Sequence, residues 1–149
     1  MRSQVSVYRG IQLIIDCYNA NPASMTAALQ LLAQVAAKGK RIAVLGDMLE
    51  LGPHSVRMHE EVGRCVARLG IDRLVACGPL GRSFADGARE AGQDPTHIIE
   101  VMDAHAAGDA VKDIARPGDV VLIKASRGMK LELVADALQR IKGAPRKAS

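Results

Sequence analysis

Short aliphatic runs alternate with amphipathic, helix-like segments along most of this chain of 149 residues. Each run is rich in β-branched or aliphatic residues, which is typical of buried strands. The expected strands cover residues 4–8, 11–15, 41–45, 73–77, 97–101 and 120–124, and the expected helices cover residues 22–38, 55–69, 82–91, 104–114 and 130–141. Repeated strand-helix units predict a parallel sheet that is covered by helices on both faces. The sequence therefore predicts an α/β fold with a Rossmann-like, mostly parallel sheet flanked by helices. The first two runs flank Arg9-Gly10 and are compatible with an N-terminal β-hairpin.

The composition argues against several classes of protein. Apolar residues make up 48% of the chain but aromatic residues only 2%, so we expect a core of Ala, Val, Leu, Ile and Met. A chain of this length can fold as one domain, because folding buries about 70% of the unfolded surface. The net charge is +4, yet three of the basic residues sit in a short tail and no element carries a basic stripe. Nucleic acid is therefore not expected as a partner.

The cysteines and histidines show no spacing typical of a metal site. Cys17, Cys65 and Cys77 are odd in number and form no Cys-x-x-Cys pair, which indicates reduced thiols in a cytoplasmic protein. The sequence shows neither a signal peptide nor an apolar run long enough to cross a bilayer. We therefore expect no metal site and no insertion into a membrane.

A polar segment stands between one of the expected strands and the first helix. It reads Asp16-Cys17-Tyr18-Asn19-Ala20-Asn21-Pro22, so one turn holds a carboxylate, a phenol and two amides. Asn21 is expected to cap the helix and Pro22 to begin it. Because a carboxylate can accept hydrogen bonds from a vicinal diol such as a ribose, Asp16 is either a nucleotide ligand or a turn-forming aspartate. Asn19 is the better of the two amides for contact with a ligand.

Two further polar segments, residues 46–52 and 125–128, also follow expected strands. Lys124 ends an apolar strand, where a charge is costly unless it projects from the sheet edge or is paired. With Ser126 and Arg127 it forms a group of donors that suits an acyl phosphate or a carboxylate. The alternative is a surface lysine and arginine beside a turn. In open α/β sheets ligands collect at the carboxyl ends of the strands, so the three segments predict one composite site.

The three segments together resemble the C-terminal domain of the Mur ligases, and specifically of the D-alanyl-D-alanine-adding MurF branch. The resemblance is carried, in the order of the family, by Asp-x-Tyr-Asn-Ala-Asn-Pro at 16–22, Gly-Asp-Met-Leu-Glu-Leu-Gly at 46–52 and Lys-Ala-Ser-Arg-Gly at 124–128. Many relatives have glycine where this chain has Ala125. The resemblance covers residues 1–142 and leaves 143–149 as a flexible basic tail.

The resemblance implies a site for a nucleotide and for a dipeptide. The residues expected at the nucleotide are Arg2, Asp16, Asn19 and Asn21. The residues expected at the dipeptide and the acyl phosphate are Lys124, Ser126 and Arg127. None of these side chains is a convincing nucleophile or general base, so their expected contribution is positioning and charge stabilisation.

The resemblance also implies further domains that this chain lacks. In the family, ATP phosphorylates the terminal carboxylate of a UDP-N-acetylmuramoyl tripeptide, and D-alanyl-D-alanine attacks the acyl phosphate to form an amide of a peptidoglycan precursor. The chain has no Gly-x-x-x-x-Gly-Lys-Ser/Thr phosphate loop. The resemblance implies that the ATP phosphates, Mg²⁺ and the UDP-sugar peptide are held by N-terminal and central domains. We expect a monomeric lid domain of a bacterial cytoplasmic ligase, inactive by itself.

Other functions stay open on sequence grounds. One is a sibling amide ligase, such as another Mur ligase or a folylpolyglutamate synthetase. Another is a receiver-like signalling domain phosphorylated at Asp47, which fits badly because a receiver needs an acidic pair after its first strand. The last is a stand-alone, non-catalytic module that binds the dipeptide. Asp47 is at least as well explained by stabilisation of a turn, and His59 by a structural role.

Overall fold

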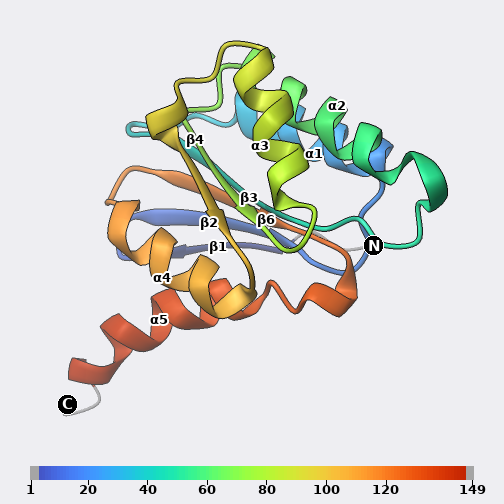
Figure 1. The fold of residues 1–149 in the computed structure, drawn as a ribbon. Coiled ribbons are helices and arrows are strands. Elements are labelled where there is room, and N and C mark those ends of the chain that lie inside the picture. The colour runs from blue at the N-terminus through green and yellow to red at the C-terminus, as the bar shows by residue number, and fades with distance from the viewer. Residues whose placement is uncertain (1–3, 147–149) are drawn as a thin grey trace.

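A six-stranded sheet forms the centre of the molecule (Figure 1). The computed structural model describes residues 4–146 of the chain, with side chains as far as Gln139. The strands lie in the order β1-β2-β6-β3-β4-β5. They are β1 Gln4–Tyr8, β2 Ile11–Asp16, β3 Arg41–Gly46, β4 Arg73–Cys77, β5 Ile98–Val101 and β6 Val120–Lys124. β1 pairs antiparallel with β2, and the other neighbouring pairs are parallel. The predicted α/β fold and its N-terminal hairpin are confirmed.

Helices cover both faces of this sheet (Figure 1). One face carries α1 Pro22–Gln34, α2 Ser55–Arg68 and α3 Gly81–Glu90, and the other carries α4 Ala104–Ile114 and α5 Leu133–Arg146. Strand β3 contributes to both cores, because Ile42 and Val44 pack with α4 and α5 whereas Ala43 and Leu45 pack with α1, α2 and α3. Successive strand residues point to opposite faces, so a strand covered on both sides is apolar throughout. Within the described residues, no helix combines the length and apolar character needed to cross a bilayer.

The hairpin turn between β1 and β2 has two residues. Both of them have positive φ, 51° at Arg9 and 84° at Gly10. Two-residue turns of this kind match the right-handed twist of the strands that they join, and glycine adopts the conformation at little cost. The turn therefore fixes the register in which Tyr8 faces Ile11 and Gln4 faces Ile15.

Helix α1 is shorter than the sequence predicted. It ends at Gln34 instead of residue 38, because Val35 is already extended, with φ −68° and ψ 136°. The guanidinium of Arg41 donates to the carbonyls of Leu32, at 3.0 Å, and Val35, at 2.6 Å. The last carbonyls of a helix need partners from outside the helix. Arg41 supplies them from β3, which the pattern of apolar residues does not reveal.

Helix α5 is shifted along the chain relative to the prediction of 130–141. Lys130 has a left-handed conformation, with φ 54°, and follows a short 3-10 turn at Arg127–Met129. The α-helix therefore begins at Leu133, and its backbone continues to Arg146. Residues 143–146, expected in a flexible tail, are helical.

Two further 3-10 turns, Gly52–His54 and Pro95–His97, precede α2 and β5. The second of them delays the start of β5 to Ile98.

Candidate functional site

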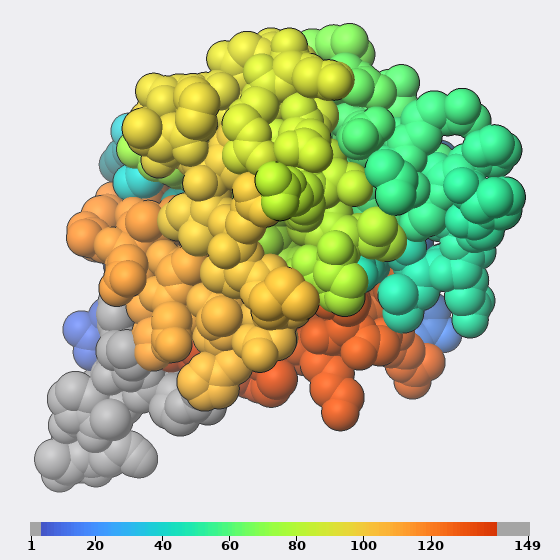
Figure 2. All heavy atoms as spheres, in the orientation of Figure 1, coloured from blue at the N-terminus to red at the C-terminus, as the bar shows by residue number. Residues whose placement is uncertain are grey.

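The candidate site lies at the edge of the sheet where β2, β6 and β3 end. These strands are neighbours, and their register places Asp16 beside Lys124 and Lys124 beside Leu45. The loops that follow the strands therefore meet, although they are far apart in the sequence. Figure 2 shows atoms of the loop after β3, in teal, next to those of the segment after β6, in orange-red. The structure thus brings the three polar segments of the sequence to one edge.

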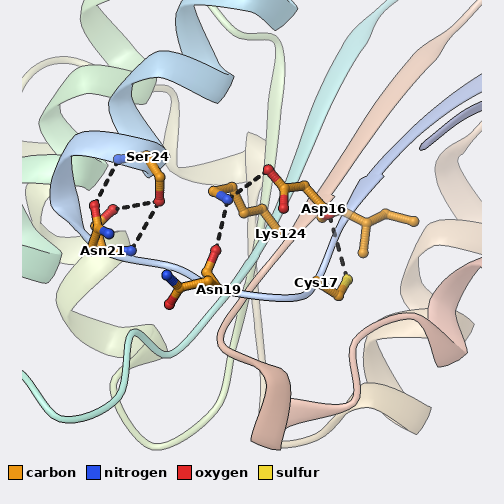
Figure 3. Close-up of polar contacts among 7 residues, drawn as sticks. Asp16, Cys17, Asn19, Asn21, Ser24 and Lys124 are labelled. Atoms are coloured by element: carbon orange, nitrogen blue, oxygen red, sulfur yellow. Dashed lines mark hydrogen bonds and ion pairs between the residues drawn. The ribbon is translucent and has the colours of Figure 1, made fainter. Parts of the chain in front are cut away.

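A buried ion pair joins the turn after β2 to the end of β6. Nζ of Lys124 lies 2.8 Å from Oδ2 of Asp16 and donates to the carbonyl of Asn19 at 3.0 Å (Figure 3). The side chains of Lys124 and Asp16 are 0% and 5% exposed. A buried charge is tolerated where it is paired and hydrogen-bonded, as this ammonium is. Lys124 therefore fixes the path of residues 16–19.

The two asparagines of this turn have different environments. Asn21 caps α1, because its Oδ1 accepts from Ser24 N at 2.9 Å while its own N–H donates to Ser24 Oγ at 3.1 Å. The predicted helix cap is confirmed, and Pro22 is the first helical residue. The Asn19 side chain is exposed and points away from the ammonium of Lys124 in Figure 3. Of the two amides, Asn19 is thus the more accessible to a ligand.

Arg127 and Tyr18 are in contact and both line an open pocket. The guanidinium carbon of Arg127 is 5.1 Å from the ring centroid of Tyr18, within the range of a cation–π contact. The pocket has a volume of about 410 Å³ and is lined by Gln4, Ile15, Cys17, Tyr18, Arg127 and Glu132. Its size is typical of small-molecule sites. The sequence did not single out Gln4, Ile15 or Glu132, because only the packing of the hairpin against the segment after β6 brings them together.

Ser126 is buried and braces two loops instead of facing the open pocket. Its Oγ accepts from Leu49 N at 2.9 Å, and its N–H donates to the carbonyl of Asp47 at 3.1 Å. The carboxylate of Asp47 in turn accepts from Leu80 N at 3.0 Å. Burial raises the pKa of Asp47, and the Leu80 N–H opposes that shift. These bonds tie the loops after β3, β4 and β6 together.

Arg2 lies outside the described residues, so its expected contact with a nucleotide stays a prediction. His59 is completely buried in α2, and burial lowers the pKa of its ring. Its neighbour on α3 is Phe84, with ring centroids 4.8 Å apart.

Cys17 directly follows Asp16 in the chain, but the environment of its thiol suppresses reactivity. The thiol donates to the carbonyl of Ile123 at 3.7 Å. Burial, followed by the charges of Glu132 and Asp16, raises the pKa of Cys17 to about 12. The thiolate is the nucleophilic form of cysteine, so Cys17 is not a nucleophile near neutral pH.

We predict that replacement of Lys124 by Met lowers the free energy of unfolding by about 3–5 kcal/mol, because it leaves the buried Asp16 carboxylate without its cation. Asp16→Asn should also destabilise the fold, and the double variant should lose clearly less than the sum of the two. Urea unfolding of the four proteins measures this coupling. As a control, Lys112→Met removes a partly exposed ion pair with Asp109 and should cost less than about 0.5 kcal/mol. If the losses of unfolding free energy in the two single variants of Lys124 and Asp16 added up to the loss in the double variant, the two side chains would not be energetically coupled.

We also predict that Cys17 resists alkylation in the folded chain. A pKa raised to about 12 leaves far less thiolate at pH 8 than an ordinary cysteine has. Iodoacetamide labelling followed by peptide mass spectrometry should show Cys17 reacting at least about 100-fold more slowly in buffer than in concentrated urea. Equal rates in the two solvents would show that the thiol is accessible and ionisable in the folded state.

Comparison with known proteins gives the evolutionary context of this geometry. A sequence model of the family described as Mur ligase, glutamate ligase domain, matches residues 1–127. The UDP-N-acetylmuramoyl-tripeptide–D-alanyl-D-alanine ligase of Bacillus subtilis is 43% identical over 133 residues, which cover 87% of this chain and 28% of the relative. The ligase of the same name from Escherichia coli is 40% identical over 129 residues, which cover 85% of this chain and 26% of the relative.

Solved structures show the same relationship. MurF from Acinetobacter baumannii matches with a TM-score of 0.80 at 27% identity, covering 92% of this chain and 30% of that one. The MurF ligase of Thermotoga maritima, solved in complex with ADP, matches with a TM-score of 0.74 at 27% identity, covering 91% and 30%. The chain spans less than a third of the length of these relatives. On the match of the family model to most of its residues, the chain belongs to the Mur ligase family, as its glutamate ligase domain.

Proposed function

We propose that this chain is the C-terminal domain of an ATP-dependent ligase that adds D-alanyl-D-alanine to a UDP-N-acetylmuramoyl tripeptide. The reaction makes a peptidoglycan precursor in the bacterial cytoplasm. The relatives at 40–43% identity carry the name of this activity, although the chain covers only a part of each. The observation that carries the proposal is the buried Lys124–Asp16 pair, which holds the turn after β2 beside the segment that bears Arg127.

The nucleotide side of the proposed site is the turn at 16–21. The exposed amide of Asn19 is available to the adenine or the ribose. Asp16 is buried against Lys124 and Asn21 caps α1, so in this proposal both act on the nucleotide by setting the shape of the turn that carries Asn19. Arg2 is proposed as a second contact to the ribose. The solved relative from Thermotoga maritima contains ADP, which supports a nucleotide in this family.

The dipeptide side is the segment at 124–127. The exposed fork of Arg127, supported by the ring of Tyr18, suits a carboxylate of the dipeptide or the oxygens of an acyl phosphate. Lys124 and Ser126 are buried, so in this proposal they act by holding Arg127 and the turn in place. The dipeptide amine would attack the acyl carbon and lose one proton, the bond from that carbon to the phosphate oxygen would break, and phosphate would leave.

The grip on the ATP phosphates and on Mg²⁺ is assigned to other domains of the ligase. The chain has no phosphate loop, and within the described residues no group of three His, Cys, Asp or Glu side chains could hold a metal. In this proposal the chain contributes contacts to the nucleoside part of ATP, through the exposed Asn19. Closure of this domain over the others would exclude water from the acyl phosphate.

A ligase that contains this chain should use D-alanyl-D-alanine as its amine substrate. Release of phosphate in the presence of ATP and the UDP-N-acetylmuramoyl tripeptide measures the reaction. We expect turnover with D-alanyl-D-alanine and at least about 100-fold less with single L-amino acids, because a site built to bind both ends of one substrate rejects others strongly. A preference for L-glutamate or another L-amino acid would reassign the domain to a sibling ligase.

Arg127→Ala in the same ligase should raise KM for D-alanyl-D-alanine about 10- to 100-fold, since it removes a charged hydrogen-bond donor. The melting temperature should stay nearly unchanged, because Arg127 belongs to an open pocket. Steady-state kinetics and differential scanning calorimetry give the two values. Arg68→Ala, which alters an exposed residue in the last turn of α2, is the matched control. Parallel losses of melting temperature and activity would count against a binding role for Arg127.

The geometry disfavours the receiver-like alternative. Asp47 is buried and its Oδ1 accepts from Leu80 N at 3.0 Å, whereas a phosphoacceptor must be reached by a phosphodonor. A stand-alone binding module is distinguished by calorimetry on the chain of 149 residues. Measurable affinity of that chain for D-alanyl-D-alanine, without any other domain, would favour the module.

A further inference from the structure

The buried ring of His59 has a fixed tautomer. Its Nδ1 lies 2.7 Å from the carbonyl oxygen of Ser55, and its Nε2 lies 3.0 Å from Met48 N. A carbonyl oxygen can only accept and a backbone N–H can only donate. Nδ1 therefore carries the proton, and Nε2 holds the loop after β3 through its lone pair. The ring is completely buried and packs on Phe84, so it cannot turn toward solvent.

The residues on either side of Met48 are the ones that hold Ser126. The carbonyl of Asp47 accepts from Ser126 N at 3.1 Å, and Leu49 N donates to Ser126 Oγ at 2.9 Å. Residues 47–49 therefore form a clamp. His59 bonds its central residue, Met48, and the two outer residues, Asp47 and Leu49, both bond Ser126. Arg127 is the next residue of the chain after Ser126.

We propose that His59 is a positioning residue, which sets the place of Ser126 and Arg127 through the clamp at 47–49. The path from ring to site has two steps, His59 to Met48 and then Leu49 or Asp47 to Ser126, and each step is a hydrogen bond of 3.1 Å or less. Helix α2 thereby supports a site to which it contributes no contacting side chain. The expected effect of His59 on substrate binding rests on the proposed function, whereas its expected effect on the position of Ser126 does not.

Two substitutions separate the two bonds of the ring. In His59→Gln the side-chain oxygen can take the place of Nε2 and accept from Met48 N. In His59→Asn the amide nitrogen can take the place of Nδ1 and donate to the carbonyl of Ser55, but nothing reaches Met48. Both variants lose the aromatic contact with Phe84, so comparing them sets the bond to Met48 against the bond to Ser55.

The first readout is amide hydrogen exchange by NMR on the chain of 149 residues. For His59→Asn we expect exchange at Met48, Leu49 and Ser126 to rise about tenfold or more, and for His59→Gln to stay near the original rates. Equal rates in the two variants, or a rise confined to Met48, would overturn the proposal. This readout needs no substrate, so it decides the positioning role even if the proposed ligase activity is wrong.

The second readout is kinetic, in a ligase that contains the chain. His59→Asn should raise KM for D-alanyl-D-alanine about tenfold while KM for ATP changes less than about twofold, and His59→Gln should restore most of the loss. A uniform loss of kcat in both variants, in proportion to lost folded protein, would show a purely structural histidine.

If either variant fails to fold, Ser126→Ala tests the clamp from its other side. Removal of the hydroxyl should speed exchange at Leu49 and, because the clamp moves as a unit, also at Met48. An effect on Leu49 alone would overturn the proposal. In the unaltered chain, ¹⁵N spectra of the ring should show a protonated Nδ1 and an unprotonated Nε2 at neutral pH, and the opposite tautomer would contradict it as well.

Discussion

The ion pair between Lys124 and Asp16 is the interaction on which the site depends. It exists because β2 and β6 are neighbours with their ends in register, which places an ammonium and a carboxylate 2.8 Å apart in a buried position. The same ammonium holds the carbonyl of Asn19 and so determines where the turn after β2 goes. A buried pair of this kind adds little net stability compared with an apolar core, but loss of either partner is severe. It specifies one arrangement of the edge.

Two kinds of residue lie at this edge of the sheet: buried residues that hold the loops in place, and exposed residues that can contact a ligand. Lys124 and Ser126 are buried, and their polar atoms bind other parts of the chain. Tyr18, Asn19 and Arg127 lie at the surface or in the open pocket. Hydrogen bonds between the loops keep these exposed side chains close to one geometry. A site that acts by positioning its substrates requires such a fixed geometry. The chemistry proposed for this domain needs no nucleophile, in agreement with the raised pKa of Cys17.

Much of the fold could be predicted because the strands are buried on both faces and therefore continuously apolar. The hairpin followed from Arg9-Gly10, and the cap at Asn21 from the chemistry of asparagine before proline. The end of α1 was wrong, because Arg41, seven residues beyond Gln34, binds the last carbonyls of the helix. A contact between two elements leaves no periodic trace in either of them.

The sequence by itself determined the order of strands and helices, the apolar core and the three polar segments that follow strand ends, because each depends on residues close together in the chain. It also showed that the charge of Lys124 needed a partner or an exit to solvent. Only the tertiary structure decided that the partner is Asp16, that Ser126 is a brace and that Arg127 shares a pocket with Tyr18. These facts depend on which strands become neighbours in the sheet. The spatial order of the strands, unlike their order along the chain, is set by the packing of the whole domain.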